Sequence, residues 1–186
     1  MNKKVIVSIC VCVGIILLMI ISGYNGLITK KEEVDSAFAD LDVMLQRRVD
    51  LIPNLINTVK GYSNYEKDVI EKVNESRERY TKANSIQEKS DANKEITSSL
   101  NSFMAVAESY PDLKASANFV QLSDELAGTE NRIATARRDY NNAVKNFNSG
   151  VIRFPNNILA KIFGMEKATY FEADEKAAEV PSVDFE

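Results

Sequence analysis

The side chains that most often perform catalysis or bind metals are nearly missing from this sequence of 186 residues. It has no histidine, and its two cysteines, Cys10 and Cys12, both lie in an apolar stretch near the N-terminus. These residue types supply the usual ligands of zinc, haem and iron–sulfur clusters and the usual nucleophile–base pairs. Carboxylate pairs stay open as a chemistry, but nothing favours one pair among the 27 acidic residues. We therefore predict a protein that is not an enzyme and holds no metal or cofactor.

Arg48 is the charged residue whose position suggests a specific partner. It falls in a row of otherwise apolar or aromatic residues spaced alternately by four and three: Val34, Phe38, Leu41, Leu45, Arg48, Ile52, Leu55, Val59 and Tyr62. This heptad spacing, typical of a coiled-coil seam, predicts one long helix over about residues 27–60. Pro53 would normally break or kink a helix. Because the spacing continues in phase beyond it, we expect a kink near Val49–Pro53 rather than an end.

A second long seam predicts another helix over about residues 116–150. If the two long helices lie antiparallel with level ends, Arg48 faces Glu130 and Asp40 faces Arg137. We hypothesise that these two ion pairs fix the register of the helices. The alternative for Arg48 is that its stem packs against the seam while its guanidinium reaches solvent.

Two shorter amphipathic segments lie between the long ones. The first runs from about residue 66 to 83, after Gly61 and a capping-box pattern at Ser63–Glu66. The second carries Ile96, Leu100, Phe103 and Ala107, starts from a cap at Ser85 or Ser90 after a loop over 84–90, and stops before Pro111. No segment alternates with the period of a strand. We predict an all-α protein whose body is an antiparallel four-helix bundle with long first and fourth helices.

The apolar run Val5–Ile21 predicts a membrane anchor. Counted on to Tyr24 it has about 20 residues, which as a helix span roughly 30 Å, the thickness of the hydrocarbon core. The alternative is a cleaved secretory signal, since Lys3 and Lys4 give a basic start. The run is longer than a usual signal core and Ile20-Ile21-Ser22 is a poor cleavage site, so we favour an uncleaved anchor. A lipoprotein signal fits no better, because both cysteines lie inside the run. The predicted organisation is an anchor over 1–24, the bundle over 25–150, and a short helix with an acidic tail over 151–186.

The segment after the bundle predicts a short helix over Pro155–Gly164, capped by Asn156 or Asn157 and ended by Gly164. Its apolar residues Ile158, Leu159, Ile162 and Phe163 gather on one face. That face either closes the base of the core or rests in the lipid headgroup region as a second membrane contact. The tail from Met165 to Glu186 is acidic, and we expect a flexible arm. Elsewhere the charges alternate in sign, which argues against nucleic-acid binding.

Several blocks of the sequence resemble the LemA family: RRVDLIPNL (47–55), TVKGY (58–62), SYPDLKA (109–115), TENRIATARRDYNNAV (129–144), FPNNILAKIFG (154–164) and YFEA (170–173). The resemblance covers nearly the whole chain. It implies a bacterial membrane protein with an N-terminal anchor and a helical bundle. Some relatives are associated with magnetosome-membrane formation, which hints at membrane organisation rather than catalysis. Many members have histidine where this chain has Tyr65, so a role needing an imidazole there does not transfer.

Two functions stay open at this point. We expect a single-pass protein of the bacterial cell membrane that acts as a scaffold for other envelope proteins. The alternative is a ligand-sensing bundle, although no polar cluster suited to a small ligand is evident away from the seam. Lys3 and Lys4 lie closer to the apolar run than Lys30 and Lys31, which by proximity favours an N-terminus inside the cell. The family resemblance implies the opposite orientation, with the N-terminus outside. We nevertheless expect an extracytoplasmic bundle, the arrangement that goes with an N-terminus inside the cell.

Overall fold

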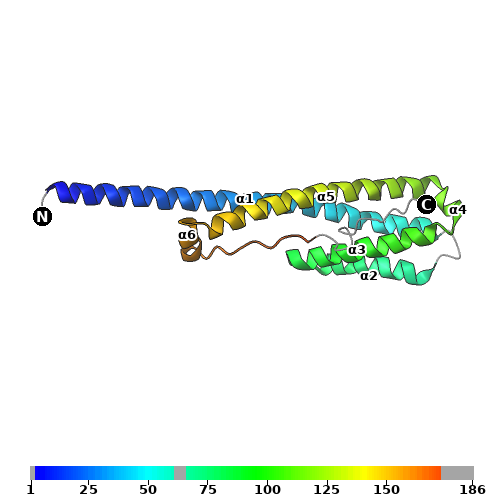
Figure 1. The fold of residues 1–186 in the computed structure, drawn as a ribbon. Coiled ribbons are helices and arrows are strands. Elements are labelled where there is room, and N and C mark those ends of the chain that lie inside the picture. Colours follow the sequence, from blue (N-terminus) through cyan, green and yellow to red (C-terminus); the bar gives the residue numbers. More distant parts are fainter. Residues whose placement is uncertain (1–2, 61–65, 173–186) are drawn as a thin grey trace, which may run out of the picture. The chain divides into compact units, whose positions relative to one another are not determined.

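The chain is all-helical where the computed structural model describes it, over residues 3–60 and 66–172 (Figure 1). No strand occurs in these two ranges. The helices are α1 (Lys3–Lys60), α2 (Lys67–Lys82), α3 (Ile86–Ala107), α4 (Pro111–Lys114), α5 (Ala117–Ile152) and α6 (Asn156–Ile162). The all-α prediction is confirmed, and the antiparallel four-helix bundle stays a prediction.

The chain folds as two compact units. Unit 1 comprises Met1–Ala39 and Arg138–Thr169, and unit 2 comprises Asp40–Arg137 and Tyr170–Glu186. Both long helices, α1 and α5, contribute one part to each unit. The boundaries predicted after residues 24 and 150 therefore do not coincide with those of the compact units.

The long helix α1 is continuous from Lys3 to Lys60, with Pro53 inside it. The sequence placed an anchor and then a separate helix from about residue 27, but no break separates them. Gly23 and Gly26 lie between the two stretches, and glycine inside a helix costs only about 1 kcal/mol relative to alanine. Pro53 does not end the helix, as its unbroken heptad phase predicted. Gly61 and the predicted cap at Ser63 lie outside the described residues. The N-cap residue of α2 is Glu66, whose side chain makes no capping hydrogen bond.

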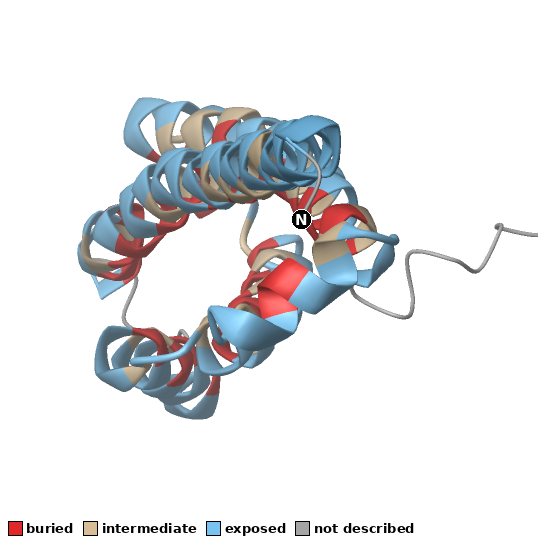
Figure 2. Ribbon diagram, turned by 90° about the vertical axis from the view of Figure 1, so that its left-hand side faces the viewer, coloured by how far each residue is buried: buried red, intermediate tan, exposed pale blue. Residues whose placement is uncertain are grey.

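The predicted seams form the core. Buried residues lie along one side of the helices, and the opposite side is exposed (Figure 2). In unit 2 the α1 seam from Leu41 to Val59 packs with buried side chains of α2, α3 and α5, of which the large ones include Tyr80, Ile96, Phe103 and Ile133. Arg48 is the charged residue buried among them. The α5 seam is looser near its start, where Leu122 and Leu126 are half-buried.

Unit 1 is built around the pairing of α1 with the end of α5 and with α6. The rings of Phe38 and Tyr140 lie 5.6 Å apart, and a Cβ placed on Gly150 would lie 3.2 Å from Cδ2 of Leu27. The two helices are therefore antiparallel here. Leu27 forms a small core with Leu159 and Ala160 of α6. Ile20, Val151 and Met165 pack against this core.

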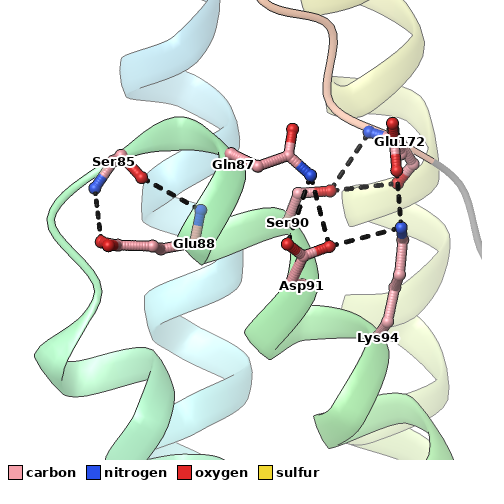
Figure 3. A network of polar contacts seen from close by, with 7 residues as sticks. All are labelled: Ser85, Gln87, Glu88, Ser90, Asp91, Lys94 and Glu172. Atoms are coloured by element: carbon pink, nitrogen blue, oxygen red, sulfur yellow. Dashed lines mark hydrogen bonds and ion pairs between the residues drawn. The ribbon is translucent and has the colours of Figure 1, made fainter.

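The connection between α2 and α3 is shorter than predicted. The helix α3 begins at Ile86, so most of the expected loop over 84–90 is helical. Its start is fixed by a capping box: the Glu88 amide donates to Oγ of Ser85 at 3.1 Å, and the Ser85 amide donates to Oε2 of Glu88 at 3.1 Å (Figure 3). Hydrogen bonds from the amides of Asn84 and Ser85 lower the pKa of Glu88. Of the two predicted caps, Ser85 is the correct one.

The residues after Gly164 are not a free arm at their start. Gly164 ends the α6 segment with a φ of 64°, as predicted, but the N-cap is Pro155 rather than Asn156 or Asn157. The chain then continues as an extended segment, residues 165–172, whose Phe171 is fully buried. The predicted flexible arm from Met165 is therefore wrong for these residues. Residues 173–186 lie outside the described part.

Candidate functional site

Arg48 lies in a polar centre inside unit 2. Its Nη1 is 2.7 Å from Oε2 of Glu130 and donates hydrogen bonds to Oδ1 of Asn93 at 3.2 Å and to Oγ1 of Thr97 at 3.0 Å. The Arg48 side chain is 6% exposed, whereas that of Glu130 is 42% exposed. Burial lowers the pKa of Arg48, and the Glu130 carboxylate opposes that shift. The guanidinium of Arg48, on α1, thus contacts side chains of two other helices, α3 and α5.

The contact between Arg48 and Glu130 is an ion pair without a hydrogen bond. Oε2 of Glu130 is shielded from solvent and accepts no hydrogen bond in the described structure, although it lies within ion-pair distance of Arg48. The attraction is therefore that of two close charges, one buried and one partly solvated. Such a pair is intermediate between a surface pair, worth under about 1 kcal/mol, and a fully buried one.

The second predicted ion pair does not form. Within residues 3–60 and 66–172, no ion pair joins Asp40 to Arg137. Asp40 is exposed and directly precedes the buried seam residue Leu41. Neighbouring residues in a helix point about 100° apart, so Asp40 faces solvent at the level where a partner was expected.

Asp42 is the centre of a second polar cluster in unit 2, which the sequence did not reveal. Its Oδ1 accepts a hydrogen bond from the Tyr80 hydroxyl at 2.8 Å and lies 2.5 Å from Nζ of Lys89. The Lys89 ammonium also lies 5.8 Å from the Tyr80 ring centre. Burial, together with the Asp42 carboxylate, raises the pKa of Tyr80. The available signal was Tyr80 on the inner stripe of α2, because a buried phenol requires a hydrogen-bond partner.

The predicted apolar face of α6 is divided. Leu159 is buried, 7% exposed, and packs with Leu27 in unit 1. Ile158, Ile162 and Phe163 are exposed. Ile158, Leu159 and Ile162 lie in α6, and Phe163 is its C-cap residue, so the split falls within a single short element. Both predicted roles are thus open to α6, since Leu159 closes a core and the other three do not.

Each unit carries an open surface hollow. One of about 450 Å³ in unit 1 lies against Tyr24, Phe147, Phe163 and Met165. Another of about 640 Å³ in unit 2 is bordered mainly by α5. Over residues 3–60 and 66–172, no three side chains of His, Cys, Asp or Glu are grouped to hold a metal ion.

The N-terminal part of α1 is exposed and apolar. An 18-residue window of this helix has a mean hydropathy of 3.1 and no buried residue, which makes α1 long and apolar enough to cross a membrane. Among the described residues it is the one helix with this property.

Comparison with known sequences decides the family. The model of the LemA family matches residues 37–185. The chain belongs to the LemA family. The LemA protein of Metamycoplasma hominis is 26% identical over 167 residues, covering 88% of this chain and 75% of that protein. Magnetosome protein MamQ 2 of Paramagnetospirillum magneticum is 25% identical over 186 residues, covering 86% of this chain and 68% of the relative. Magnetosome protein MamQ of Magnetospirillum gryphiswaldense is 22% identical over the same shares of both chains.

In this LemA-family chain, the blocks that resemble the family lie at structural positions described above. RRVDLIPNL contains Arg48, TENRIATARRDYNNAV contains Glu130 and Tyr140, FPNNILAKIFG is α6 with its flanks, and YFEA includes the buried Phe171. Family membership and the apolar helix together indicate a membrane-associated helical protein.

Proposed function

We propose that this chain is a membrane-anchored scaffold, which holds a helical body at the bacterial envelope for other proteins to bind and has no catalytic activity. The observation that carries the proposal is the continuity of α1 from Lys3 to Lys60. One uninterrupted helix passes from an exposed apolar segment into the buried seam of the body. The same element therefore serves as the anchor and as part of the scaffold.

The exposed surface of the first part of α1 requires an apolar environment. Most of its large apolar side chains from Val5 to Ile21 are roughly half exposed or more. Leaving them in water costs about 25 cal/mol per Å² of apolar surface, and a bilayer removes that cost. An apolar helix of about 20 residues satisfies its own backbone hydrogen bonds across the hydrocarbon core.

The relatives support an organising role. Two of the relatives described above are named as magnetosome proteins, which fits a role in organising a membrane better than a catalytic role. The polar centres at Arg48 and Asp42 join different helices of unit 2, which fits a role in holding the body together rather than in chemistry. Orientation is part of the proposal, with the body outside the cytoplasm. Protease added to intact protoplasts is expected to remove the body, and full protection would contradict that orientation.

The scaffold role is tested by isolating native complexes. The full chain, tagged at its C-terminus, is extracted in mild detergent and purified with whatever it holds. A partner must copurify in a constant ratio and must be displaced when untagged chain is added in excess. The absence of any displaceable partner, in cells where the chain is abundant, would contradict the scaffold.

A second function, ligand sensing, is favoured by one observation. The hollow of about 450 Å³ in unit 1 is in the size range of small-molecule sites and has aromatic and apolar walls, with Lys31 and Asp35 beside them. A ligand there is expected to raise the melting temperature of the full chain in detergent. Replacing Phe147 with alanine would remove that shift if the hollow is the site. A melting shift without any displaceable protein partner would favour sensing over the scaffold.

A further inference from the structure

A cluster of exposed apolar side chains surrounds α6. Phe154 is 80% exposed and Ile162 is 68% exposed, and Ile158 and Phe163 are also exposed. We name these four residues the α6 apolar surface. Two of them, Ile158 and Ile162, lie on α6, and this helix packs against Leu27 of α1 through Leu159 and Ala160. The surface is therefore presented on a fixed element.

The α6 apolar surface lies at the level where the apolar run of α1 ends. A Cβ placed on Gly23 would lie 2.7 Å from Cδ1 of Leu159 and 2.9 Å from Oδ1 of Asn156, so α6 approaches α1 at that turn (Figure 1). Ile20 packs against the same small core. Because the apolar run ends at Tyr24, a span over this run puts α6 at the edge of the hydrocarbon core.

Aromatic side chains mark this level. The rings of Tyr24 and Phe163 have centroids 4.5 Å apart, which joins the last apolar turn of α1 to the α6 apolar surface. Pro155 and Asn156 border the same surface hollow as Ile15, Leu18 and Met19 of α1. Tyrosine, the residue type of Tyr24, is enriched where a bilayer meets water. The lipid-facing side of α1 thus continues without interruption onto α6.

The charge of this segment suits anionic headgroups. Residues 151–164 contain Arg153 and Lys161 and no acidic residue, in a chain with an overall charge of −4. Both basic side chains are exposed. Basic residues beside an apolar face are the usual composition of a segment that lies in the membrane interface.

We propose that residues 152–163 form a second, shallow membrane contact that binds the headgroup region of an anionic bilayer. The apolar side chains of the α6 apolar surface enter the acyl boundary, and Arg153 and Lys161 pair with lipid phosphates. The inference rests on the proposed insertion of α1, since α1 sets the depth of α6. A second contact beside the span restrains unit 1 against tilting on its anchor.

The test measures the depth of single labels in the full chain. Cys10 and Cys12 are replaced by serine, and an environment-sensitive NBD fluorophore is attached at Phe154→Cys or Ile162→Cys. Matched controls carry the label at Leu18→Cys in the apolar run and at Val43→Cys, an exposed apolar position of unit 2. Each chain is placed singly in nanodiscs of phosphatidylcholine, with or without phosphatidylglycerol. A parallel set of nanodiscs also contains a lipid that carries a doxyl quencher near its headgroup.

Labels at positions 154 and 162 are expected to shift to shorter wavelength than the label at 43 and to be quenched by the shallow doxyl group. The shift should be larger with phosphatidylglycerol, and Arg153→Gln with Lys161→Gln should remove that difference. Circular dichroism of each variant shows that the helices are retained. If the label at 18 is in lipid while those at 154 and 162 match the label at 43, the second contact is wrong and the anchor stands.

Two further outcomes distinguish the alternatives. If the label at 18 is also aqueous, the anchor and the second contact fail together. If the labels at 154 and 162 are aqueous with one chain per disc but shielded with two, the surface binds a second copy and not lipid, which overturns the proposal.

Discussion

Units 1 and 2 each hold part of the extended segment 165–172, and they do so by different means. In unit 1 the Asn148 side chain pairs with the backbone of Ala168, donating to its oxygen at 2.9 Å and accepting from its amide at 2.8 Å. The Tyr140 hydroxyl donates to the oxygen of Thr169 at 2.6 Å. These contacts are made to main-chain atoms of the segment, so they do not depend on the identity of its side chains.

In unit 2 the same segment is held mainly by burial of Phe171, with further contacts at Glu172. Phe171 is fully buried, and the Ser90 hydroxyl accepts from the Glu172 amide at 3.2 Å while Lys94 lies 2.8 Å from the Glu172 carboxylate (Figure 3). The Glu172 side chain is 57% exposed and the Lys94 side chain 28%, so solvent weakens their ion pair. Burial of the ring is therefore the larger contribution. The segment is thus positioned by hydrogen bonds from side chains to its backbone in unit 1, whereas burial of Phe171 is its main stabilising contact in unit 2.

The largest effect is expected from Phe171→Ala. Removing a fully buried phenylalanine ring loses its transfer free energy and leaves a cavity, which costs about 3–5 kcal/mol. The free energy of unfolding is measured with urea and circular dichroism on the full chain in mild detergent. Tyr170→Ala is the matched control, because this neighbour is exposed and should change stability little. Equal losses in the two variants would contradict side-chain burial as the force in unit 2.

The next effect concerns the buried charge of unit 2. Glu130→Gln leaves the Arg48 guanidinium buried with neutral partners, and we expect a loss of about 2 kcal/mol, since one member of the pair is partly solvated. Arg48→Met should cost less, about 1 kcal/mol, because Glu130 can reach water while Asn93 loses its donor. Asp40→Asn is the control and should be neutral. A neutral or stabilising Arg48→Met would contradict a stabilising role for the pair.

A smaller effect is expected in unit 1 from Asn148→Ala. The substitution removes two hydrogen bonds to Ala168, and we expect a loss of about 1–2 kcal/mol. Asn148→Asp should be at least as destabilising, because its carboxylate would face the Ala168 oxygen. The exposed Asn142→Ala serves as the control. If Asn148→Ala matched Asn142→Ala, recognition of the backbone would not be the means by which unit 1 holds the segment.

The smallest effect is a dependence on alkaline pH. Burial, with the Asp35 carboxylate, raises the pKa of Tyr140 from 10.0 to about 12. The folded chain thus keeps this proton at pH values where the unfolded chain has lost it, so stability falls between about pH 10 and 12. Tyr140→Phe should make the urea midpoint less sensitive to pH in that range. Tyr80→Phe in unit 2 should act in the same direction. An unchanged pH slope in Tyr140→Phe would contradict the buried state of this phenol.

The helices themselves were predictable because their signals are local. Heptad spacing over residues 34–62 and 119–147 gave α1 and α5, and the pattern before Pro111 gave the end of α3. The capping box at Ser85 and Glu88 was visible in the sequence, yet the polar run around it suggested a loop instead. Polar composition alone does not distinguish a solvated loop from the exposed side of a helix.

The polar centres required more than spacing. Level ends of two antiparallel helices suggested Arg48 with Glu130, and these two charges do meet. The same argument failed for Asp40 and Arg137, because a register gives the height along a helix but not the direction in which a side chain points. The partners Asn93 and Thr97 lie on α3, whose placement beside Arg48 no local pattern indicates.

The sequence by itself determined the all-helical class, the long apolar segment near the N-terminus and the place of Arg48 in the seam of α1, since each follows from periodicity or composition within one segment. Only the tertiary structure decided that Leu159 is buried while Ile158, Ile162 and Phe163 are exposed. It also decided that Phe171, which belongs to an acidic C-terminal segment of the sequence, is buried in a core. The physical reason is that burial depends on which neighbours remove water from a side chain. Those neighbours come from distant parts of the chain.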